Sequence, residues 1–276
     1  MRQRAILITG CSSGIGRHCA LAMRDRGWRV FATARTPDDI ADLAARGLEA
    51  THLDYADTAS VAAAVDFALA AAGGRLDALF NNGGYAQPGA IEDLSQAAIR
   101  EQFDANFFGW HELVRLVVPV MRRQGSGRIV QNGSVLGFIA MPVRGAYTAT
   151  KHAIEGYSDT LSMELAGSGI HVSVIEPGPI ESRLAQNALK AARRHIDVES
   201  SVHRKTYQRR LAALERGGNI RGQLGPEAVM KALVHACESP RPKLRYRVTV
   251  PARVMAVARR VLPARTLVSL LGRIRA

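Results

Sequence analysis

The sequence predicts an α/β protein with one doubly wound, parallel sheet of about seven strands and helices on both faces. Short apolar runs rich in β-branched residues alternate with longer segments of helical periodicity, as in a parallel sheet that is covered on both sides. The first apolar run ends in a glycine-rich turn that leads into a helix. Of the 276 residues, 47% are hydrophobic and 22% are charged, so a large core can form.

The expected strands and helices follow one another in strict alternation. Strands are expected near residues 4–9, 28–33, 48–53, 77–81, 127–133, 170–175 and 245–250. Helices are expected near residues 14–26, 38–46, 58–72, 96–123, 145–166 and 226–238. Right-handed crossovers between such strands give a Rossmann-type sheet. Because no repeat or low-complexity linker interrupts the pattern, we expect residues 1–276 to form a single domain.

An insertion at residues 183–222 separates the last two expected strands. It is basic and partly helical, and it ends in the glycine-rich run Gly217-Gly218-Asn219. An insertion at this point lies beyond the carboxyl edge of the sheet, where ligands bind in such folds. We expect a substrate lid; the alternative is a pair of packed surface helices.

The net charge of +13 is concentrated at the C-terminal end of the chain. Residues 241–276 contain ten basic and no acidic residues, which leaves 27 basic against 24 acidic residues, a net of +3, in the remainder. The mixture of apolar residues and arginines in residues 251–276 predicts one or two basic amphipathic helices, interrupted at Pro263. We expect them to pack on their own domain or on a second subunit; the alternative is peripheral contact with an anionic membrane.

The composition indicates in which compartment the protein works and which classes of partner it has. No apolar span of 18 residues and no signal-peptide pattern occurs, so a cytoplasmic protein is expected. Cys11, Cys19 and Cys237 lack metal-ligand spacing, which predicts reduced thiols and no metal site. No nucleic-acid partner is expected, because no recognition motif accompanies the charge and only 5% of residues are aromatic.

The turn after the first strand is suited to a phosphate group. Its sequence, Thr9-Gly10-Cys11-Ser12-Ser13-Gly14-Ile15-Gly16, has G-x-x-x-G-x-G spacing. Glycines allow a tight turn and a close approach of the backbone, and the following helix offers free N–H groups and a positive dipole. We expect a dinucleotide to bind Gly10, Ser12, Ser13, Gly14, Ile15 and Gly16.

The end of the second strand indicates which dinucleotide. Proteins of this architecture that bind NAD carry a carboxylate there, which bonds the ribose hydroxyls. This chain has Ala34, followed by Arg35, whose planar guanidinium can bind a 2′-phosphate. NADP(H) is therefore expected over NAD(H), with Arg17 as a further positive charge.

Tyr147 and Lys151 lie four residues apart, which places both on one helical face. A tyrosine has an ordinary pKa of about 10, and a cation within a few ångströms lowers such a pKa by roughly 1–3 units. Lys151 is expected to do so, which would make Tyr147 a usable acid and base. Ser134 would polarise a substrate carbonyl.

Together these motifs resemble those of the short-chain dehydrogenase/reductase (SDR) family. Asn81-Asn82-Gly83-Gly84 resembles the Asn-Asn-Ala-Gly of that family, and Pro177-Gly178-Pro179-Ile180-Glu181-Ser182 resembles its Pro-Gly segment. The spacing of thirteen residues from Ser134 to Tyr147 is also usual there. The likeness is firm over residues 4–182. Ala32-Thr33-Ala34-Arg35 and the extended C-terminus resemble bacterial relatives of the 17β-hydroxysteroid and retinol dehydrogenases.

The resemblance implies further roles. Asn106 would hold a water in a proton relay from Lys151, which would also bond the nicotinamide ribose. Asp54 would contact the adenine. The remaining residues expected to bind the cofactor are Asn82, Gly83, Pro177, Gly178, Ile180 and Ser182. Relatives commonly pair through the helix that bears Tyr147, so a homodimer or homotetramer is expected.

The sequence therefore predicts an NADP(H)-dependent oxidoreductase that transfers a hydride to or from a carbonyl or alcohol carbon. An apolar wall favours a lipophilic small-molecule substrate such as a ketone, aldehyde or secondary alcohol, with a steroid- or retinoid-like skeleton as one form it can take. Its expected residues are Val135, Leu136, Phe138, Ile139, Met141, Pro142, Tyr85 and Leu184. The alternatives are a non-catalytic NADPH-sensing protein and a basic adaptor.

Overall fold

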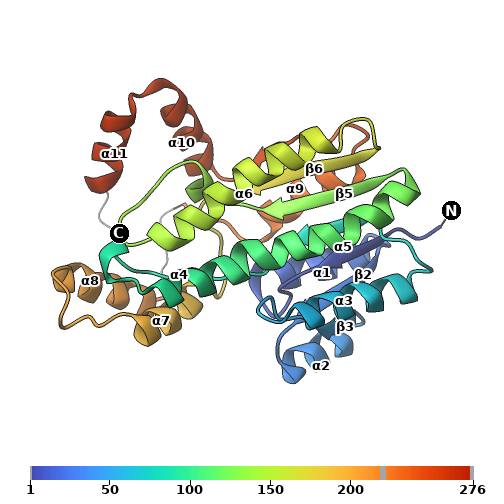
Figure 1. The fold of residues 1–276 in the computed structure, drawn as a ribbon, viewed down its shortest axis with the longest axis horizontal. Coiled ribbons are helices and arrows are strands. Elements are labelled where there is room, and N and C mark those ends of the chain that lie inside the picture. Colours follow the sequence, from blue (N-terminus) through green and yellow to red (C-terminus); the bar gives the residue numbers. More distant parts are fainter. Residues whose placement is uncertain (1, 218–221, 274–276) are drawn as a thin grey trace.

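The computed structural model describes residues 2–217 and 222–273 and contains one seven-stranded sheet in the order β3-β2-β1-β4-β5-β6-β7 (Figure 1). All neighbouring strands are parallel, which confirms the predicted fold class. The strands are β1 (Ala5–Ile8), β2 (Arg29–Ala34), β3 (Glu49–His52), β4 (Ala78–Asn81), β5 (Gly127–Asn132), β6 (Ile170–Glu176) and β7 (Arg245–Arg247).

Helices connect the strands and extend the chain beyond them. They are α1 (Gly14–Asp25), α2 (Pro37–Ala45), α3 (Thr58–Ala71), α4 (Gln96–Phe103), α5 (Gly109–Gln124), α6 (Gly145–Glu164), α7 (Leu184–His195), α8 (Arg204–Glu215), α9 (Glu227–Glu238), α10 (Val250–Val261) and α11 (Ala264–Arg273). Among the described residues, no helix combines the length and the apolar character needed to cross a bilayer.

The central strand β1 is apolar throughout because both faces of the sheet are covered. Ile6 and Ile8 of β1 pack into a core with α1 and α9, whereas Leu7 packs into a second core with α3, α5 and α6. Successive side chains of a strand point to opposite faces, so a run of three apolar residues serves both cores. Burying each such side chain contributes roughly 1.5–3 kcal/mol.

Two predicted elements end differently in the structure. The single helix expected at 96–123 is divided by a π-helical turn at Asp104–Phe108. At its end, the missing side chain of Gly109 makes room for the Tyr55 ring, which would lie 2.3 Å from a β-carbon there. The strand expected at 245–250 stops at Arg247, because the Thr249 hydroxyl accepts a hydrogen bond from Ala252 N and caps α10.

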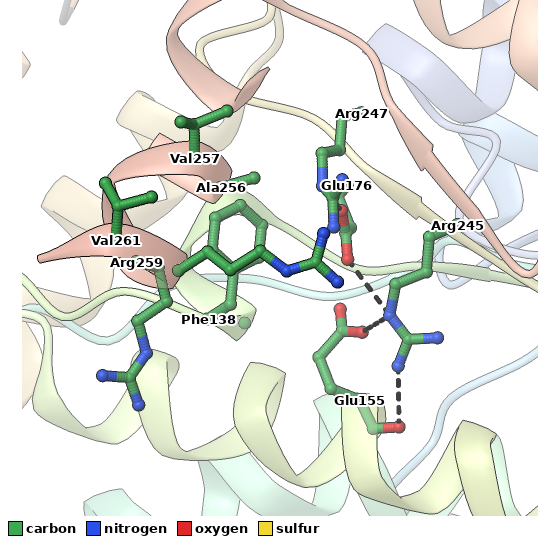
Figure 2. Close-up of a pocket in the computed structure, with 11 residues that line it drawn as sticks. Phe138, Glu155, Glu176, Arg245, Arg247, Ala256, Val257, Arg259 and Val261 are labelled. Atoms are coloured by element: carbon green, nitrogen blue, oxygen red, sulfur yellow. Dashed lines mark hydrogen bonds and ion pairs between the residues drawn. The ribbon is translucent and has the colours of Figure 1, made fainter. Parts of the chain in front are cut away.

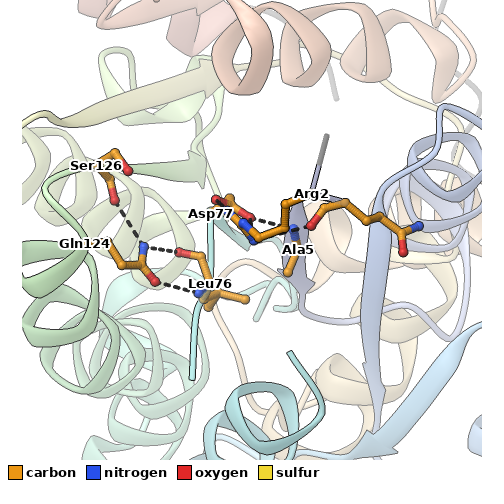
Figure 3. A network of polar contacts seen from close by, with 7 residues as sticks. Arg2, Ala5, Leu76, Asp77, Gln124 and Ser126 are labelled. Carbon is orange, nitrogen blue, oxygen red and sulfur yellow. Dashed lines mark hydrogen bonds and ion pairs between the residues drawn. The ribbon is translucent and has the colours of Figure 1, made fainter. Parts of the chain in front are cut away.

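Polar contacts join the strands at the amino edge of the sheet (Figure 3). Asp77 accepts hydrogen bonds from Arg2, at 2.6 and 3.1 Å, and from the Ala5 amide, at 2.8 Å. Gln124 bonds both the amide and the carbonyl of Leu76. These contacts tie the starts of β1 and β4 to the end of α5 and leave the carboxyl edge to the loops.

The loops and extra helices gather at the carboxyl edge. In Figure 1, α7, α8, α10 and α11 lie at the end of the molecule to which β5 points, away from the N-terminus. The expected site residues come from the loops at this same edge and from the helical segments that contain Asn106, Tyr147 and Lys151.

Candidate active site

The glycine-rich turn between β1 and α1 forms a cradle of backbone. Gly10 and Gly14 have φ values of +69° and +53°, a region that favours glycine. A β-carbon at Gly16 would lie 2.2 Å from the Gly10 carbonyl oxygen. Ser13 stands at the N-cap of α1 without a capping side-chain hydrogen bond, so the first amides of the helix are not satisfied that way. Such a cradle fits a pyrophosphate group.

A second loop, after β4, lies directly against this turn. Thr9 Oγ1 accepts hydrogen bonds from the amides of Asn82 and Gly83 at 2.9 and 3.2 Å. A β-carbon at Gly10 would lie 2.4 Å from Gly83 Cα. Gly83 stands where the related family has alanine, and the structure explains why: a β-carbon there would lie 2.8 Å from the Tyr55 hydroxyl.

The structure brings Ser134, Tyr147 and Lys151 together. Ser134 is buried just beyond β5, close enough to Tyr147 to lower the pKa of that hydroxyl. Its oxygen accepts a bond from the Leu136 amide, so its proton is available to another acceptor. Lys151 Nζ lies 5.6 Å from the centre of the Tyr147 ring, one turn along α6.

Asn106 lies nearby but is held by other partners. It is fully buried within the π-helical turn. Its Oδ1 accepts from the Tyr85 amide at 3.1 Å, and its Nδ2 donates to the Tyr85 carbonyl at 2.9 Å and to Thr150 Oγ1 at 3.4 Å. In this structure the side chain fixes the loop after β4 beside α6, and the expected water relay remains a prediction.

Burial governs the protonation of Lys151. Burial lowers its pKa to about 7, against the opposing effect of Glu155. Its ammonium donates a hydrogen bond to the Asn132 carbonyl at 2.7 Å and lies 4.4 Å from the centre of the Trp110 ring. The group is therefore poised to gain or lose a proton near neutral pH.

The pKa of Tyr147 differs from the sequence-based expectation. Burial raises it above the ordinary value, while the hydrogen bond from Ser134 and the charge of Arg144 lower it. Lys151 is not among the causes. Its ammonium is directed to Asn132 and Trp110, and this explains why the expected stabilisation of the phenolate by Lys151 is not seen here.

Arg144 is a residue that sequence reasoning missed. It is the N-cap residue of α6, where the helix dipole disfavours a positive charge, and burial lowers its pKa. It forms no ion pair with any other residue in the described ranges. The preceding Val143 has a φ of +60°, which is strained for a β-branched residue. An arginine three residues before the tyrosine was visible in the sequence, but its burial was not.

Asn132 was missed as well, and it links the lysine to the glycine turn. Its carbonyl accepts from Lys151, and its Nδ2 donates to Asn82 Oδ1 at 2.9 Å. Asn82 in turn donates to the carbonyls of Thr9 and Gly10, at 2.8 and 3.3 Å. A continuous chain of hydrogen bonds thus runs from Lys151 to the phosphate-binding turn.

The segment after β6 closes the other side of the cradle. The Pro177 carbonyl accepts from the Val135 amide at 2.8 Å, next to Ser134. A β-carbon at Gly178 would lie 2.3 Å from Thr249 Oγ1, and Ile180 forms a parallel bridge with Leu224. Ser182 Cβ would lie 2.9 Å from a β-carbon at Gly14, which places the end of this segment on the phosphate-binding turn.

The residues expected to bind the adenosine half occupy the ends of β2 and β3. Ala34 is buried and Arg35 is exposed, and Arg35 has no ion-pair partner in the described part of the chain. Arg17 instead pairs with Asp42 at 2.8 Å. Asp54 follows β3, and its Oδ1 accepts from the Ala56 amide.

The apolar wall is in part a core beneath the C-terminal helices. Leu136 and Ile139 are buried against Leu267 and Leu271 of α11. Tyr147 contacts the edge of the same cluster, together with Val135, Phe138 and Met141. The inner face of α11 therefore covers the loop that follows Ser134.

The insertion is packed against the body through α8. The Tyr207 hydroxyl donates to Asp93 Oδ2 at 2.6 Å and accepts from the Ala90 amide at 2.7 Å, and the side chain is fully buried. Leu184, at the start of α7, is partly exposed. Of the glycine-rich run expected to end this insertion, Gly218 and Asn219 lie outside the described residues.

A cavity of about 440 Å³ lies behind α6 and under α10 (Figure 2). Arg245 stands between Glu155 and Glu176, at 2.9 and 3.3 Å. Burial raises the pKa of Glu155 to about 7, with the nearby Glu176 acting in the same direction and Arg245 against it. Glu155 lies one helical turn beyond Lys151 on α6, whereas Glu176 ends β6, and sequence spacing alone did not indicate this pair.

Curated relatives resemble most of the chain. An uncharacterized oxidoreductase of Escherichia coli K12, YbbO, is 40% identical over 96% of this chain and 93% of its own length. Human 17-beta-hydroxysteroid dehydrogenase type 1 is 33% identical over 89% of this chain and 77% of its own length. Bovine retinol dehydrogenase 8 is 35% identical over 88% and 81%, respectively.

Solved structures share the fold and hold nicotinamide dinucleotides. A Burkholderia phymatum short-chain dehydrogenase/reductase in complex with NAD has a TM-score of 0.78 at 24% identity, covering 98% of this chain and 96% of its own. An actinorhodin polyketide ketoreductase with NADPH has a TM-score of 0.72 at 25% identity, covering 89% and 95%. The short chain dehydrogenase family profile matches residues 4–193. This chain therefore belongs to the short-chain dehydrogenase/reductase family of oxidoreductases.

Proposed function

We propose that this protein is an NADP(H)-dependent oxidoreductase in which Tyr147 exchanges a proton with the oxygen of a carbonyl or alcohol substrate. The observation that carries the proposal is the meeting of Ser134, Tyr147 and Lys151 beside a glycine cradle at one sheet edge. Each residue type has a matching chemical task, and together they need no metal to polarise the substrate.

Two parts of the site support binding of the cofactor. The cradle of Gly10, Gly14 and Gly16 would hold the pyrophosphate, and the Pro177–Ser182 segment would border the nicotinamide end. The small, buried Ala34 and Arg35, which has no ion-pair partner among residues 2–217 and 222–273, support NADP(H) over NAD(H), because they leave room and positive charge for a 2′-phosphate. Bound NADP(H) supplies the hydride in reduction and accepts it in oxidation.

The protein's side chains then handle the proton. In reduction, Tyr147 donates its proton to the substrate oxygen, and Ser134 donates a hydrogen bond to the same oxygen as negative charge develops. Lys151, whose pKa is about 7, and Asn106 restore the proton on Tyr147. In oxidation the same groups work in reverse.

The substrate is proposed to be a lipophilic ketone, aldehyde or secondary alcohol. The partly buried side chains of Val135, Phe138 and Met141 adjoin Tyr147 and offer apolar contact. Two relatives are named for steroid and retinol substrates, which supports the same class. We also propose that the 183–222 insertion closes over this substrate through α7, which begins two residues after Ser182, while Tyr207 anchors α8.

A homodimer or homotetramer is proposed to form through α5 and α6. Apolar side chains lie at the surface of this region: Met163 of α6 is 75% exposed, and Phe108, in the π-helical turn just before α5, is 54% exposed. Large apolar groups on adjoining helices are typical of subunit contacts.

The decisive experiment is Tyr147→Phe, assayed by nicotinamide absorbance across a panel of carbonyl compounds. We expect the variant to bind NADPH as the wild type does but to lose turnover by about 10²–10⁴-fold, because the proton donor is gone. The matched control is Tyr157→Phe on the same helix. Wild-type-like turnover of Tyr147→Phe would remove the proposed role. Wild-type protein that binds NADPH but reduces nothing would favour a sensor.

A further inference from the structure

The outer face of α10 carries an apolar stripe that no described residue covers. Four valines recur at helical spacing along one side, and none of them packs into a core. Val250, Val254, Val257 and Val261 are 68%, 53%, 61% and 69% exposed. On the adjoining α11, Val268 and Leu270 are 65% and 49% exposed.

These valines are not the face that holds the helices on the body. That role belongs to the inner faces, where Ala252 is fully buried and Leu267 and Leu271 are each 4% exposed. Met255, Ala258 and Leu262 complete the inner contact with Leu136 and Ile139. Packing on the domain therefore leaves the valine stripe unexplained.

Positive charge accompanies the stripe. Residues 250–273 contain five arginines and no acidic residue, and all five arginines are exposed. Arg253 and Arg260 follow Val250 and Val257 by three positions, so they border the stripe. Within the described ranges, none of the following forms an ion pair: Arg253, Arg259, Arg260, Arg265 and Arg273.

The positive charge of these arginines favours an anionic bilayer over a second copy of the chain as the partner of the valine stripe. A second copy of the chain placed symmetrically on this face would bring ten arginines together without one carboxylate from these helices. An anionic bilayer surface offers both an apolar layer for valines and phosphates for arginines. In Figure 2, Val257 and Val261 line the α10 side of the cavity, on the far side of Phe138 from the ion pairs of Arg245, and they remain 61% and 69% exposed.

We propose that the outer faces of α10 and α11 dock on the surface of a bilayer that contains anionic phospholipid. The valines enter the boundary between headgroups and acyl chains, and the arginines bind the phosphates. Because the inner face of α11 covers the loop after Ser134, docking brings the apolar wall of the site close to the bilayer. The inference does not rest on the proposed function, since docking is measured without turnover.

Vesicle co-sedimentation tests the proposal. The probes are vesicles of phosphatidylcholine alone and vesicles with about one third phosphatidylserine. We expect the full chain to sediment with the anionic vesicles only, and less as salt rises. Val257→Glu with Val261→Glu should abolish sedimentation, and Arg259→Gln with Arg260→Gln should weaken it on the order of tenfold.

The matched control is Val202→Glu. Val202 is 87% exposed in the loop before α8, away from the stripe, so this variant should sediment as the wild type does. Unfolding temperatures should match in all variants, because every substituted side chain is exposed. Absence of sedimentation with anionic vesicles at low salt would overturn the proposal, as would an equal loss in Val202→Glu. An oligomer that dissociates in the double valine variant, without vesicle binding, would make the stripe a subunit interface instead.

Discussion

At the scale of residues, Arg35 is the side chain proposed to select the cofactor. It follows the buried Ala34 at the carboxyl end of β2, and it has no ion-pair partner in the described part of the chain, whereas Arg17 is held by Asp42. Arg35→Ala is expected to lower the ratio of kcat/KM for NADPH to that for NADH by about 10- to 100-fold, because a charged hydrogen bond is lost. Arg46→Ala, at the end of α2, should leave the ratio unchanged. An unaltered ratio in Arg35→Ala would remove this residue from cofactor selection.

Arg144 affects the acid–base chemistry of Tyr147 through its charge. The guanidinium favours the phenolate and so lowers the pKa of Tyr147. Arg144→Met removes that effect, so the pKa of Tyr147 rises, and the basic form appears only at higher pH. We expect the pH profile of kcat/KM for alcohol oxidation to move upward by about one unit, with rates recovering at high pH.

The control for this shift is Arg100→Met, an exposed arginine on α4. It should keep the wild-type profile. A purely structural role for Arg144 would lower rates at every pH without moving the profile, and that outcome would contradict the prediction.

At the scale of elements, α6 places Glu155 one turn beyond Lys151 on the side of β6 and β7. Burial raises the pKa of Glu155 from 4.5 to about 7. Between these values the folded protein binds more protons than the unfolded chain, so this group makes stability fall as pH rises. In Glu155→Gln, the decrease in the free energy of unfolding between pH 4.5 and 7 should be smaller by about 2 kcal/mol than in the wild type. Urea unfolding at several pH values measures this difference.

Glu164→Gln provides the comparison for Glu155. Glu164 is exposed at the end of the same helix, so its substitution should leave the pH dependence of unfolding as it is in the wild type. If the free energy of unfolding changed with pH equally in Glu155→Gln and in the wild type between pH 4.5 and 7, burial would not raise the pKa of this carboxyl group, and the prediction would be wrong.

Elements whose signals are local were predicted well. Strands such as β1 and β2 appear as apolar runs because both sheet faces are buried there, and the glycine turn is visible because few other residues fit it. The π-helical turn at 104–108 was not predicted, since no glycine or proline lies within it. Its cause is tertiary: Tyr55 packs against Gly109, and Asn106 bonds the loop at Tyr85.

Contacts between segments that are distant in the sequence could not be predicted at the site either. Asn132 joins Lys151 to Asn82, and Arg245 reaches Glu155, over separations of 19, 50 and 90 residues. No periodicity or motif encodes such pairs, because only the strand order brings them together. The types of the proposed catalytic residues could be identified from the sequence, but the network that positions them could not.

For the whole molecule, we expect the amino edge of the sheet to contribute to stability and the carboxyl edge to bind the cofactor and substrate. The amino edge is tied by Arg2, Asp77 and Gln124 (Figure 3). The carboxyl edge carries the glycine cradle, Asn82 and the proposed catalytic side chains. Asp77→Ala removes the partner of Arg2 and leaves the Ala5 amide without its acceptor. It should lower the free energy of unfolding by about 1–3 kcal/mol.

The same variant should bind NADPH as tightly as the wild type, because the cradle lies at the opposite ends of β1 and β4. Asn82→Ala is the complementary change, since it removes the bonds to Thr9 and Gly10 and should raise the Kd for NADPH. Chemical denaturation and fluorescence titration of both variants measure the two effects separately. If Asp77→Ala weakened cofactor binding as much as Asn82→Ala does, the sheet would transmit strain from one edge to the other, and the proposed division would be wrong.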